Sequence, residues 1–204
     1  SRNVIGLLPG RGHPDEWVLY SAHWDHLGVG EPDARGDTIY NGAVDNAAGV
    51  AQLLEIARAF AQAKPTQRSL GFLFVAAEEQ GLLGSEYYAD NPVYPLSRTV
   101  AVINTDSPSP NGPARDFSTS GDAPLTLQDT LIDTARAFQR RFTPDSRPEA
   151  GLFYRSDHFS FAKRGVPALS FNSGEDLREG GVAAGKAWSE AYSRDRYHQQ
   201  ARSE

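Results

Sequence analysis

The feature that most constrains this chain is an unbroken apolar run at residues 70–77, which two glutamates follow directly. A strand that is exposed on one side alternates apolar and polar residues, whereas a continuous apolar run is typical of a strand buried on both faces. Such strands lie in sheets that helices cover on both sides. The run therefore predicts a strand in the middle of a helix-covered sheet.

Three other segments are also strand-like. Residues 17–22, 99–104 and 166–171 are short and rich in apolar residues, and helical patterns separate them. Strands that alternate with helices favour an α/β fold. We predict a three-layer sandwich with a mixed, mostly parallel central sheet and helices on both faces, formed by residues 1–204 as a single domain.

The helices are predicted from apolar spacing. Residues 46–64 carry apolar side chains at helical intervals, with Asp45 or Asn46 as the expected N-cap and Pro65 at the end. Further helices are expected at residues 84–90, 124–141 and 159–163, and from residue 187 onward. Glycine-rich or proline-rich stretches at residues 28–42, 107–113 and 174–185 are interpreted as loops.

Polar residues follow the predicted strands at the point where each strand ends. His23 and Asp25 follow the first, Glu78 and Glu79 the second, and Asp106 the third. In open α/β sheets the carboxyl ends of the strands form the binding site. We therefore expect these side chains to converge.

Each of these residues also has a plain structural interpretation. Asp45 could be a helix cap, Asp106 could start a turn before Pro108, and His23 could belong to a polar loop. Two adjacent acids at the mouth of a buried strand are costly unless they are used, so Glu78 and Glu79 favour a functional site. Because neighbouring residues point in different directions, one could bind a metal while the other acts as a general base.

A carboxylate has two oxygens, so Asp45 could bridge two metal ions about 3.5–4 Å apart. Either His158 or His198 could complete the ligand set, and the residue pattern does not choose between them. His26 and His13 have weaker sequence context, and His13 is assigned no role.

Composition narrows the functional classes. The chain has no cysteine, so any metal must be held by His, Asp or Glu, which suits zinc or manganese. The net charge is −6 and the basic residues are scattered, so no nucleic-acid partner is expected. No apolar run approaches the roughly 18 residues of a membrane span, so no membrane partner is expected.

Taken in order, six motifs resemble the zinc exopeptidase family that includes bacterial secreted leucyl aminopeptidases, glutamate carboxypeptidase and glutaminyl cyclase. The motifs are His23-x-Asp25, Val44-Asp45-Asn46-Ala-Ala-Gly49, Ala77-Glu78-Glu79, Ile103-Asn-x-Asp106, Ser156-Asp157-His158 and Tyr197-His198.

The resemblance implies a cofactor of two zinc ions. His23 and Asp106 would hold one zinc, Glu79 and His198 the other, and Asp45 would bridge them. It thus favours His198 over His158.

The resemblance also implies roles for the remaining residues. Glu78 would be the general base and then the proton donor, and Asp25 would orient His23. Tyr197 would stabilise the oxyanion, while Asp157 and His158 would support the wall of the site.

The implied activity is hydrolysis of the N-terminal peptide bond of peptide substrates. The alternatives are a zinc carboxypeptidase or dipeptidase, for which Arg155 could hold a substrate carboxylate, a glutaminyl-cyclase-like single-zinc acyltransferase, and a non-catalytic receptor. The family usually has an acid a few residues after Tyr-His, where this chain has Gln199-Gln-Ala-Arg-Ser-Glu204, and an apolar segment after Asp106, where this chain has Ser107-Pro-Ser-Pro110. The start at Ser1 without methionine suggests a piece trimmed from a longer precursor. The resemblance implies a secreted or periplasmic protein, with a protease-associated domain as a candidate neighbour in the full-length protein.

Overall fold

The computed structural model describes residues 1–121, 125–145 and 148–200, and its centre is a seven-stranded sheet. In spatial order the strands are β1 (Val4–Leu8), β5 (Arg68–Val75), β2 (His13–His23), β6 (Thr99–Thr105), β9 (Ala168–Ser173), β7 (Asp116–Thr119) and β8 (Arg141–Phe142).

The middle of the sheet is parallel. Strands β5, β2, β6 and β9 run in the same direction, whereas β1 is antiparallel to β5 and β7 is antiparallel to β9. The predicted mixed, mostly parallel sheet is confirmed. The carboxyl ends of the four central strands therefore lie at one edge.

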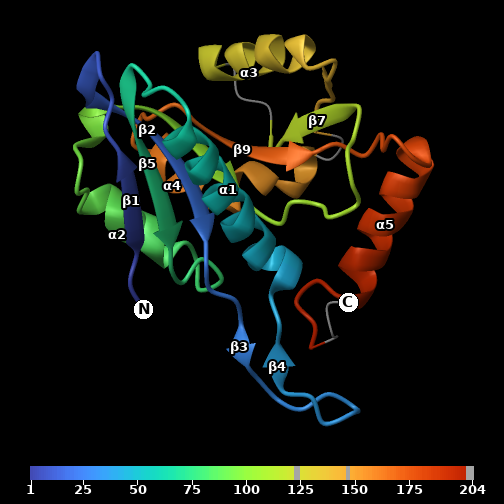
Figure 1. Cartoon of the computed structure of the whole chain (residues 1–204). Helices are drawn as coiled ribbons and strands as arrows, with labels where there is room; N and C mark the ends of the chain where they lie inside the picture. Colours follow the sequence, from blue (N-terminus) through green and yellow to red (C-terminus); the bar gives the residue numbers. More distant parts are fainter. Residues whose placement is uncertain (122–124, 146–147, 201–204) are drawn as a thin grey trace.

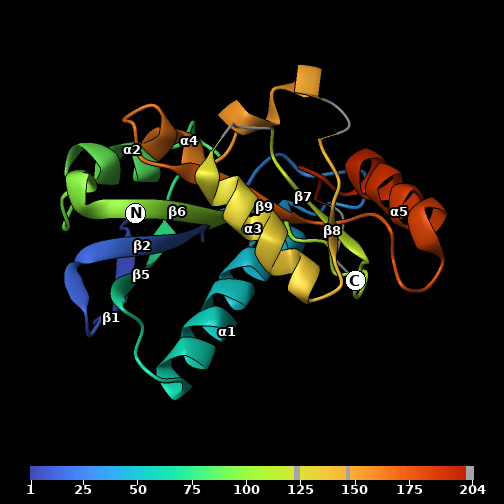
Figure 2. The same ribbon diagram turned by 90° about the horizontal axis from the view of Figure 1, so that it is seen from above.

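Helices cover both faces of the sheet. Figure 2 shows α1 on one side and α2 and α4 on the other, which confirms the three layers. The helices are α1 (Gly49–Gln62), α2 (Leu83–Asp90), α3 (Thr126–Ala137), α4 (His158–Ala162) and α5 (Gly181–Asp195), with short 3-10 turns at Leu96–Arg98, Pro148–Ala150 and Leu152–Tyr154. A small hairpin of β3 (Gly28–Val29) and β4 (Ile39–Tyr40) projects from the sandwich (Figure 1).

Burial on both faces explains the unbroken apolar run. Leu73 and Val75 of β5 belong to a core cluster that includes Phe161 of α4, while Phe72 lies in a second cluster with Leu53 of α1. Side chains alternate across a strand, so a strand between two helical layers needs apolar residues at every position.

Three predicted segments differ from the structure. Residues 28–42 were expected to be a loop, but they contain the paired strands β3 and β4. Residues 174–185 were also expected to be a loop, but α5 already begins at Gly181 and lies to one side of the sandwich (Figure 1). The predicted helix over residues 124–141 ends at Ala137, because Arg141 belongs to β8; residue 124 lies outside the described residues. Among the described residues, no helix has the length and apolar character needed to cross a membrane.

Candidate metal centre

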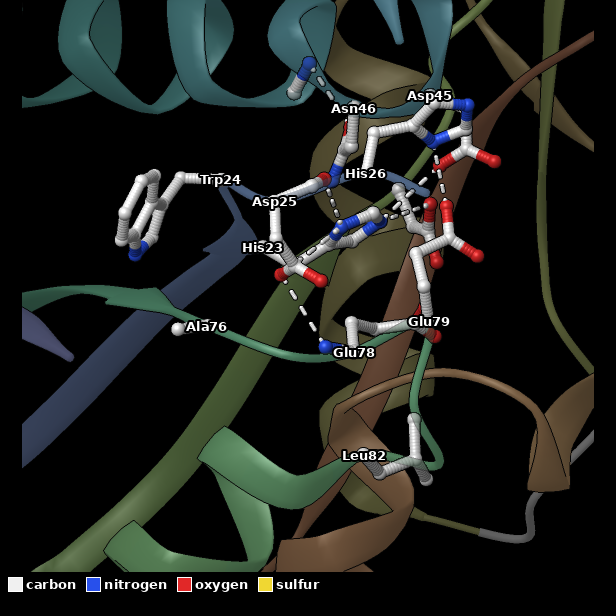
Figure 3. Close-up of polar contacts among 12 residues, drawn as sticks. His23, Trp24, Asp25, His26, Asp45, Asn46, Ala76, Glu78, Glu79 and Leu82 are labelled. Carbon is white, nitrogen blue, oxygen red and sulfur yellow. Dashed lines mark hydrogen bonds and ion pairs between the residues drawn. The ribbon is translucent and has the colours of Figure 1, made fainter. Parts of the chain in front are cut away.

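The predicted polar residues meet at the carboxyl edge of the sheet, as Figure 3 shows for most of them. His23 is the last residue of β2, Glu78 and Glu79 follow β5, and Asp106 follows β6. These three strands are neighbours in the sheet. Asp45 reaches the same place from the segment before α1.

His23 is the centre of a first group of ligand atoms. Its Nε2 atom lies 3.2 Å from Asp45 Oδ1 and 3.3 Å from Asp106 Oδ1. Its other ring nitrogen, Nδ1, donates to the main-chain carbonyl of Asp25 at 3.2 Å. Ser156 Oγ donates to Asp106 Oδ2 at 2.6 Å, which fixes that carboxylate from the far side. His23 thus has one nitrogen held by the backbone and the other turned towards two acids.

A second group surrounds His198. Its Nε2 atom lies 3.2 Å from Glu79 Oε2 and 3.4 Å from Asp45 Oδ2, yet this buried nitrogen forms no hydrogen bond with either. Asp45 therefore faces His23 with one oxygen and His198 with the other. This is the arrangement that a bridging carboxylate requires.

The distances from His23 and from His198 to their neighbouring carboxylates fit a zinc ion. Ligand atoms bound to one tetrahedral zinc at about 2.0–2.1 Å lie roughly 3.3 Å from one another. The four distances from His23 and His198 to their neighbouring carboxylates are 3.2–3.4 Å. Imidazole nitrogens and carboxylate oxygens are also ligands that zinc accepts.

The turn before α1 separates the two predicted cap residues. Asn46 Oδ1 accepts a hydrogen bond from the Gly49 main-chain nitrogen at 3.1 Å, so Asn46 serves as the cap. Asp45 has φ −110° and ψ 89°, which is not helical. Its carboxylate is left to face the two histidines.

The protonation of His23 reflects the surrounding acids. Burial lowers its pKa, but hydrogen bonds to Asp106 and Asp45 outweigh burial and raise the pKa to about 12. Without a metal, the proton on His23 thus balances the negative charge of Asp106 and Asp45. A bound cation would balance the same charge.

Glu78 is the most strongly perturbed carboxylate at this edge. Burial raises its pKa to about 9, which prevails over the opposing effect of His23. The main-chain nitrogen of Glu78 donates to Asp25 Oδ1 at 3.2 Å (Figure 3). Asp25 therefore touches His23 with its carbonyl and supports Glu78 with its carboxylate.

The two other residues of the Tyr-His and Ser-Asp-His motifs lie in different settings. Tyr197 stacks on His198 with ring centroids 3.9 Å apart, and burial raises the pKa of its phenol to about 12, so it stays a hydrogen-bond donor. His158 is fully buried against the Phe153 ring, and neither of its nitrogens has a hydrogen-bond partner among the described residues. Burial lowers the pKa of His158 to about 4 and raises that of Asp157 to about 7. The structure brings His198, and not His158, to Glu79 and Asp45.

The family model for peptidase family M28 matches residues 3–202. The chain belongs to peptidase family M28. This confirms the family that the six motifs predicted.

Known proteins similar to this M28 chain are longer. Leupeptin-inactivating enzyme 1 from Streptomyces exfoliatus is 30% identical over 190 residues, which cover 90% of this chain and 38% of that protein. A fungal relative named as a probable zinc metalloprotease, from Pyrenophora teres f. teres, is 40% identical over 103 residues, which cover 50% of this chain and 22% of that protein.

A solved structure also shares the fold. The zinc aminopeptidase BSAP from Bacillus subtilis has a TM-score of 0.64 at 22% identity, over 93% of this chain and 47% of that chain.

One residue at the M28 site was not predicted. His26 Nδ1 lies 2.6 Å from Glu79 Oε1, and His26, Asp45 and Glu79 together could hold a metal. The only sequence signal was its place in His-Trp-Asp-His, three residues after His23. Trp24, in the same motif, is half exposed and points away from the centre (Figure 3).

A separate hollow of about 580 Å³ lies near the end of α3 and contains none of these side chains. It is lined by Gln139 and by Arg115, Arg136, Arg140, Arg141 and Arg178.

Proposed function

We propose that this chain is the catalytic part of a two-zinc aminopeptidase that hydrolyses the N-terminal peptide bond of peptides. The observation that carries the proposal is the position of Asp45, which offers one oxygen to the His23 group and the other to the His198 group. A single carboxylate between two sets of ligand atoms at zinc-like spacing is the geometry of a two-metal site.

Two similar proteins support this proposal by their names. BSAP is named a zinc aminopeptidase, and a Pseudomonas aeruginosa protein named aminopeptidase is 29% identical over 198 residues. This chain spans 34% of the Pseudomonas protein and 38% of the Streptomyces enzyme. The activity of the whole protein is therefore part of the proposal.

In the proposed reaction, two zinc ions held by His23, Asp106, Asp45, Glu79 and His198 would supply a water of lowered pKa and polarise the scissile carbonyl. The protein's own groups do the rest of the chemistry.

Glu78 accepts the proton of the attacking water and returns it to the departing amine. A positive charge beside Glu78 lowers its pKa from the raised value of the metal-free site and keeps it ionised, as a base must be. Tyr197 remains protonated and donates a hydrogen bond to the developing oxyanion.

The names of two similar proteins favour substrates with a free amino terminus, because the Pseudomonas aeruginosa protein and BSAP are both named as aminopeptidases. The carboxylates of Asp45, Glu79 and Asp106 are assigned to the two zinc ions and are not counted as a binding site for the substrate ammonium group. A carboxypeptidase would need cationic residues facing the substrate, and Arg155, whose charge acts on Tyr197, is a candidate.

One alternative is favoured by a specific observation. A glutaminyl cyclase from Porphyromonas gingivalis has a TM-score of 0.65 at 24% identity, over 88% of this chain and 65% of that chain. A single-zinc acyl transfer would leave one of the two groups of ligand atoms without a role. The number of zinc ions bound per chain therefore separates the two functions.

The test is an assay of zinc-loaded protein against paired substrates that differ only in their amino terminus. Leucyl-p-nitroanilide and its N-acetyl form make one such pair, and a free and an N-blocked dipeptide make another. We expect cleavage of the free substrates only, loss of cleavage with a chelator and recovery with added zinc. Cleavage of the N-blocked dipeptide would indicate a carboxypeptidase, and cyclisation of amino-terminal glutamine without hydrolysis would indicate the acyltransferase.

A further inference from the structure

We propose that His26 is a positioning residue for Glu79: its Nδ1–H group donates to Glu79 Oε1 and leaves Oε2 as the oxygen that binds zinc. The inference rests on the proposed two-zinc function, because it assigns Glu79 to the zinc held with His198. It gives His26 the role of a hydrogen-bond donor and not that of a ligand.

Distance separates these two roles. The two atoms of the His26–Glu79 contact lie 2.6 Å apart, slightly shorter than the roughly 2.7–2.9 Å of a charge-assisted N–H···O hydrogen bond. Two ligand atoms on the same tetrahedral zinc would be roughly 3.3 Å apart. His198, on the opposite oxygen of Glu79, lies at 3.2 Å. His26 Nδ1 and Glu79 Oε1 are thus too close together to bind the same ion, whereas the spacing between His198 Nε2 and Glu79 Oε2 leaves room for one.

His26 is held in place by the segment that carries Asp45. A Cβ atom on Gly42 would lie 2.8 Å from both Cβ and Cγ of His26 and 2.9 Å from the Asp45 carbonyl oxygen. Gly42 has φ +63°, a left-handed conformation that glycine adopts without strain. The absence of a side chain at Gly42 therefore lets the backbone close on the His26 ring.

The His26 ring also meets the other side of the zinc group. It contacts the His198 ring edge-on, with centroids 5.8 Å apart and planes at 68°. The side chains of His26 and Glu79 are 11% and 5% exposed, so little water competes for their hydrogen bond. Figure 3 shows the His26 ring directly above the Glu79 carboxylate.

These contacts have a consequence for zinc binding. A carboxylate with two free oxygens can rotate or bind one ion through both. The hydrogen bond from His26 removes that freedom and orients Oε2 towards His198. Loss of a hydrogen-bond partner behind a metal ligand typically lowers metal affinity by roughly 10–100-fold.

The test is competitive zinc titration against a chromophoric chelator, with His26→Ala, His26→Asn and the control His13→Ala compared with the wild-type chain. His13 is exposed at the start of β2. We expect His26→Ala to lower the affinity for one of the two zinc ions by roughly 10–100-fold and to leave the affinity for the other unchanged. His26→Asn should recover much of the affinity, because its amide nitrogen can donate from a similar position. His13→Ala should behave as wild type.

Three results would overturn the role of His26. They are wild-type affinity in His26→Ala, no recovery in His26→Asn, or complete loss of one zinc as in His198→Ala, which would make His26 a ligand. Circular dichroism of each variant verifies that it is folded. A wild-type chain that binds a single zinc contradicts the two-zinc function itself, whereas two zinc ions with unchanged His26→Ala affinity contradict only this inference.

Discussion

Glu78 and Glu79 are adjacent in the sequence but face different partners. Ala77, just before them, has φ +57°, a left-handed conformation that costs a non-glycine residue about 1–2 kcal/mol. This turn lets the Glu78 main chain bond to Asp25 while the Glu79 carboxylate meets His198. The backbone cost is consistent with a site that needs the two carboxylates in separate positions.

The separation predicts that Glu78 can be changed without loss of metal. Glu78→Gln keeps the size of the side chain but cannot accept the proton of the attacking water. We expect unchanged zinc content and a fall in kcat of roughly 10²–10⁴-fold, measured by metal analysis and steady-state kinetics. Glu55→Gln, on the exposed surface of α1, is the matched control and should change neither quantity. Loss of zinc with a nearly normal rate would contradict the role of Glu78.

The sequence allowed the convergence at this edge to be predicted but not its fine contacts. Glu78 and Asp106 each follow an apolar run, and parallel strands bring such ends together. The approach of His26 to Glu79 depends on how the loop after β2 folds back, which a pattern of apolar residues does not predict. Which of Asp45 and Asn46 caps the helix was likewise evident only from the geometry of the turn.

His198, the last proposed ligand along the chain, does not come from the edge of the sheet that carries His23. It follows α5, in which only Gly185 is buried. Aromatic rings connect helix and ligand: Trp188 stacks on Tyr192 at 5.1 Å, and Tyr197 stacks on His198 at 3.9 Å. His198 thus lies at the edge of the sheet although α5, which precedes it, buries little of its own surface.

This arrangement predicts opposite effects for the two competing histidines. His198→Ala should reduce bound zinc from two ions to one and leave the stability of the metal-free chain nearly unchanged. His158→Ala should keep both zinc ions but lower the free energy of unfolding by about 1–3 kcal/mol, because it empties a fully buried position of α4.

Metal analysis and chemical denaturation of the same two variants test this crossed pattern. Zinc loss in His158→Ala together with full zinc content in His198→Ala would reverse the assignment.

The strands missed in the central sheet are short and lie at or near its margins: β1, β7 and β8. β7 (Asp-Phe-Ser-Thr) and β8 (Arg-Phe) contain few apolar residues, whereas β1 (Val-Ile-Gly-Leu-Leu) is apolar but so short that its pattern alone does not identify a strand. The start of α5 was missed because Gly180 and Gly181, both with positive φ, look like part of a loop. Central strands were predictable because burial on two faces leaves a clear pattern.

For the whole molecule, the fold concentrates negative charge at one edge of a chain whose net charge is −6. Without a metal, the folded chain relieves this charge by holding protons. The pKa of Glu78 rises from 4.5 to about 9 through burial. That of His23 rises from 6.5 to about 12, because its hydrogen bonds to Asp106 and Asp45 outweigh burial. Burial also raises the pKa of Asp157 to about 7 and lowers that of His158 to about 4, and these two shifts oppose each other below pH 6.5. The folded state therefore binds more protons than the unfolded state between about pH 4.5 and pH 12.

This excess of bound protons fixes the sign of the pH dependence. Stability falls with pH wherever the folded state holds more protons, so the metal-free chain should lose stability between about pH 5 and pH 9. Zinc replaces those protons as the source of positive charge, so the zinc-loaded chain should show a flatter profile. Each zinc ion should also add about 2.7 kcal/mol of stability when free zinc is 100 times the Kd of its site. Thermal melts with a chelator and with zinc across this range measure both effects.

Glu78→Gln serves as the control, since it should remove part of the pH dependence of stability in the metal-free series. A metal-free melting temperature that rises or stays constant from pH 5 to 9 would show that the acids at this edge are not coupled to folding in this way.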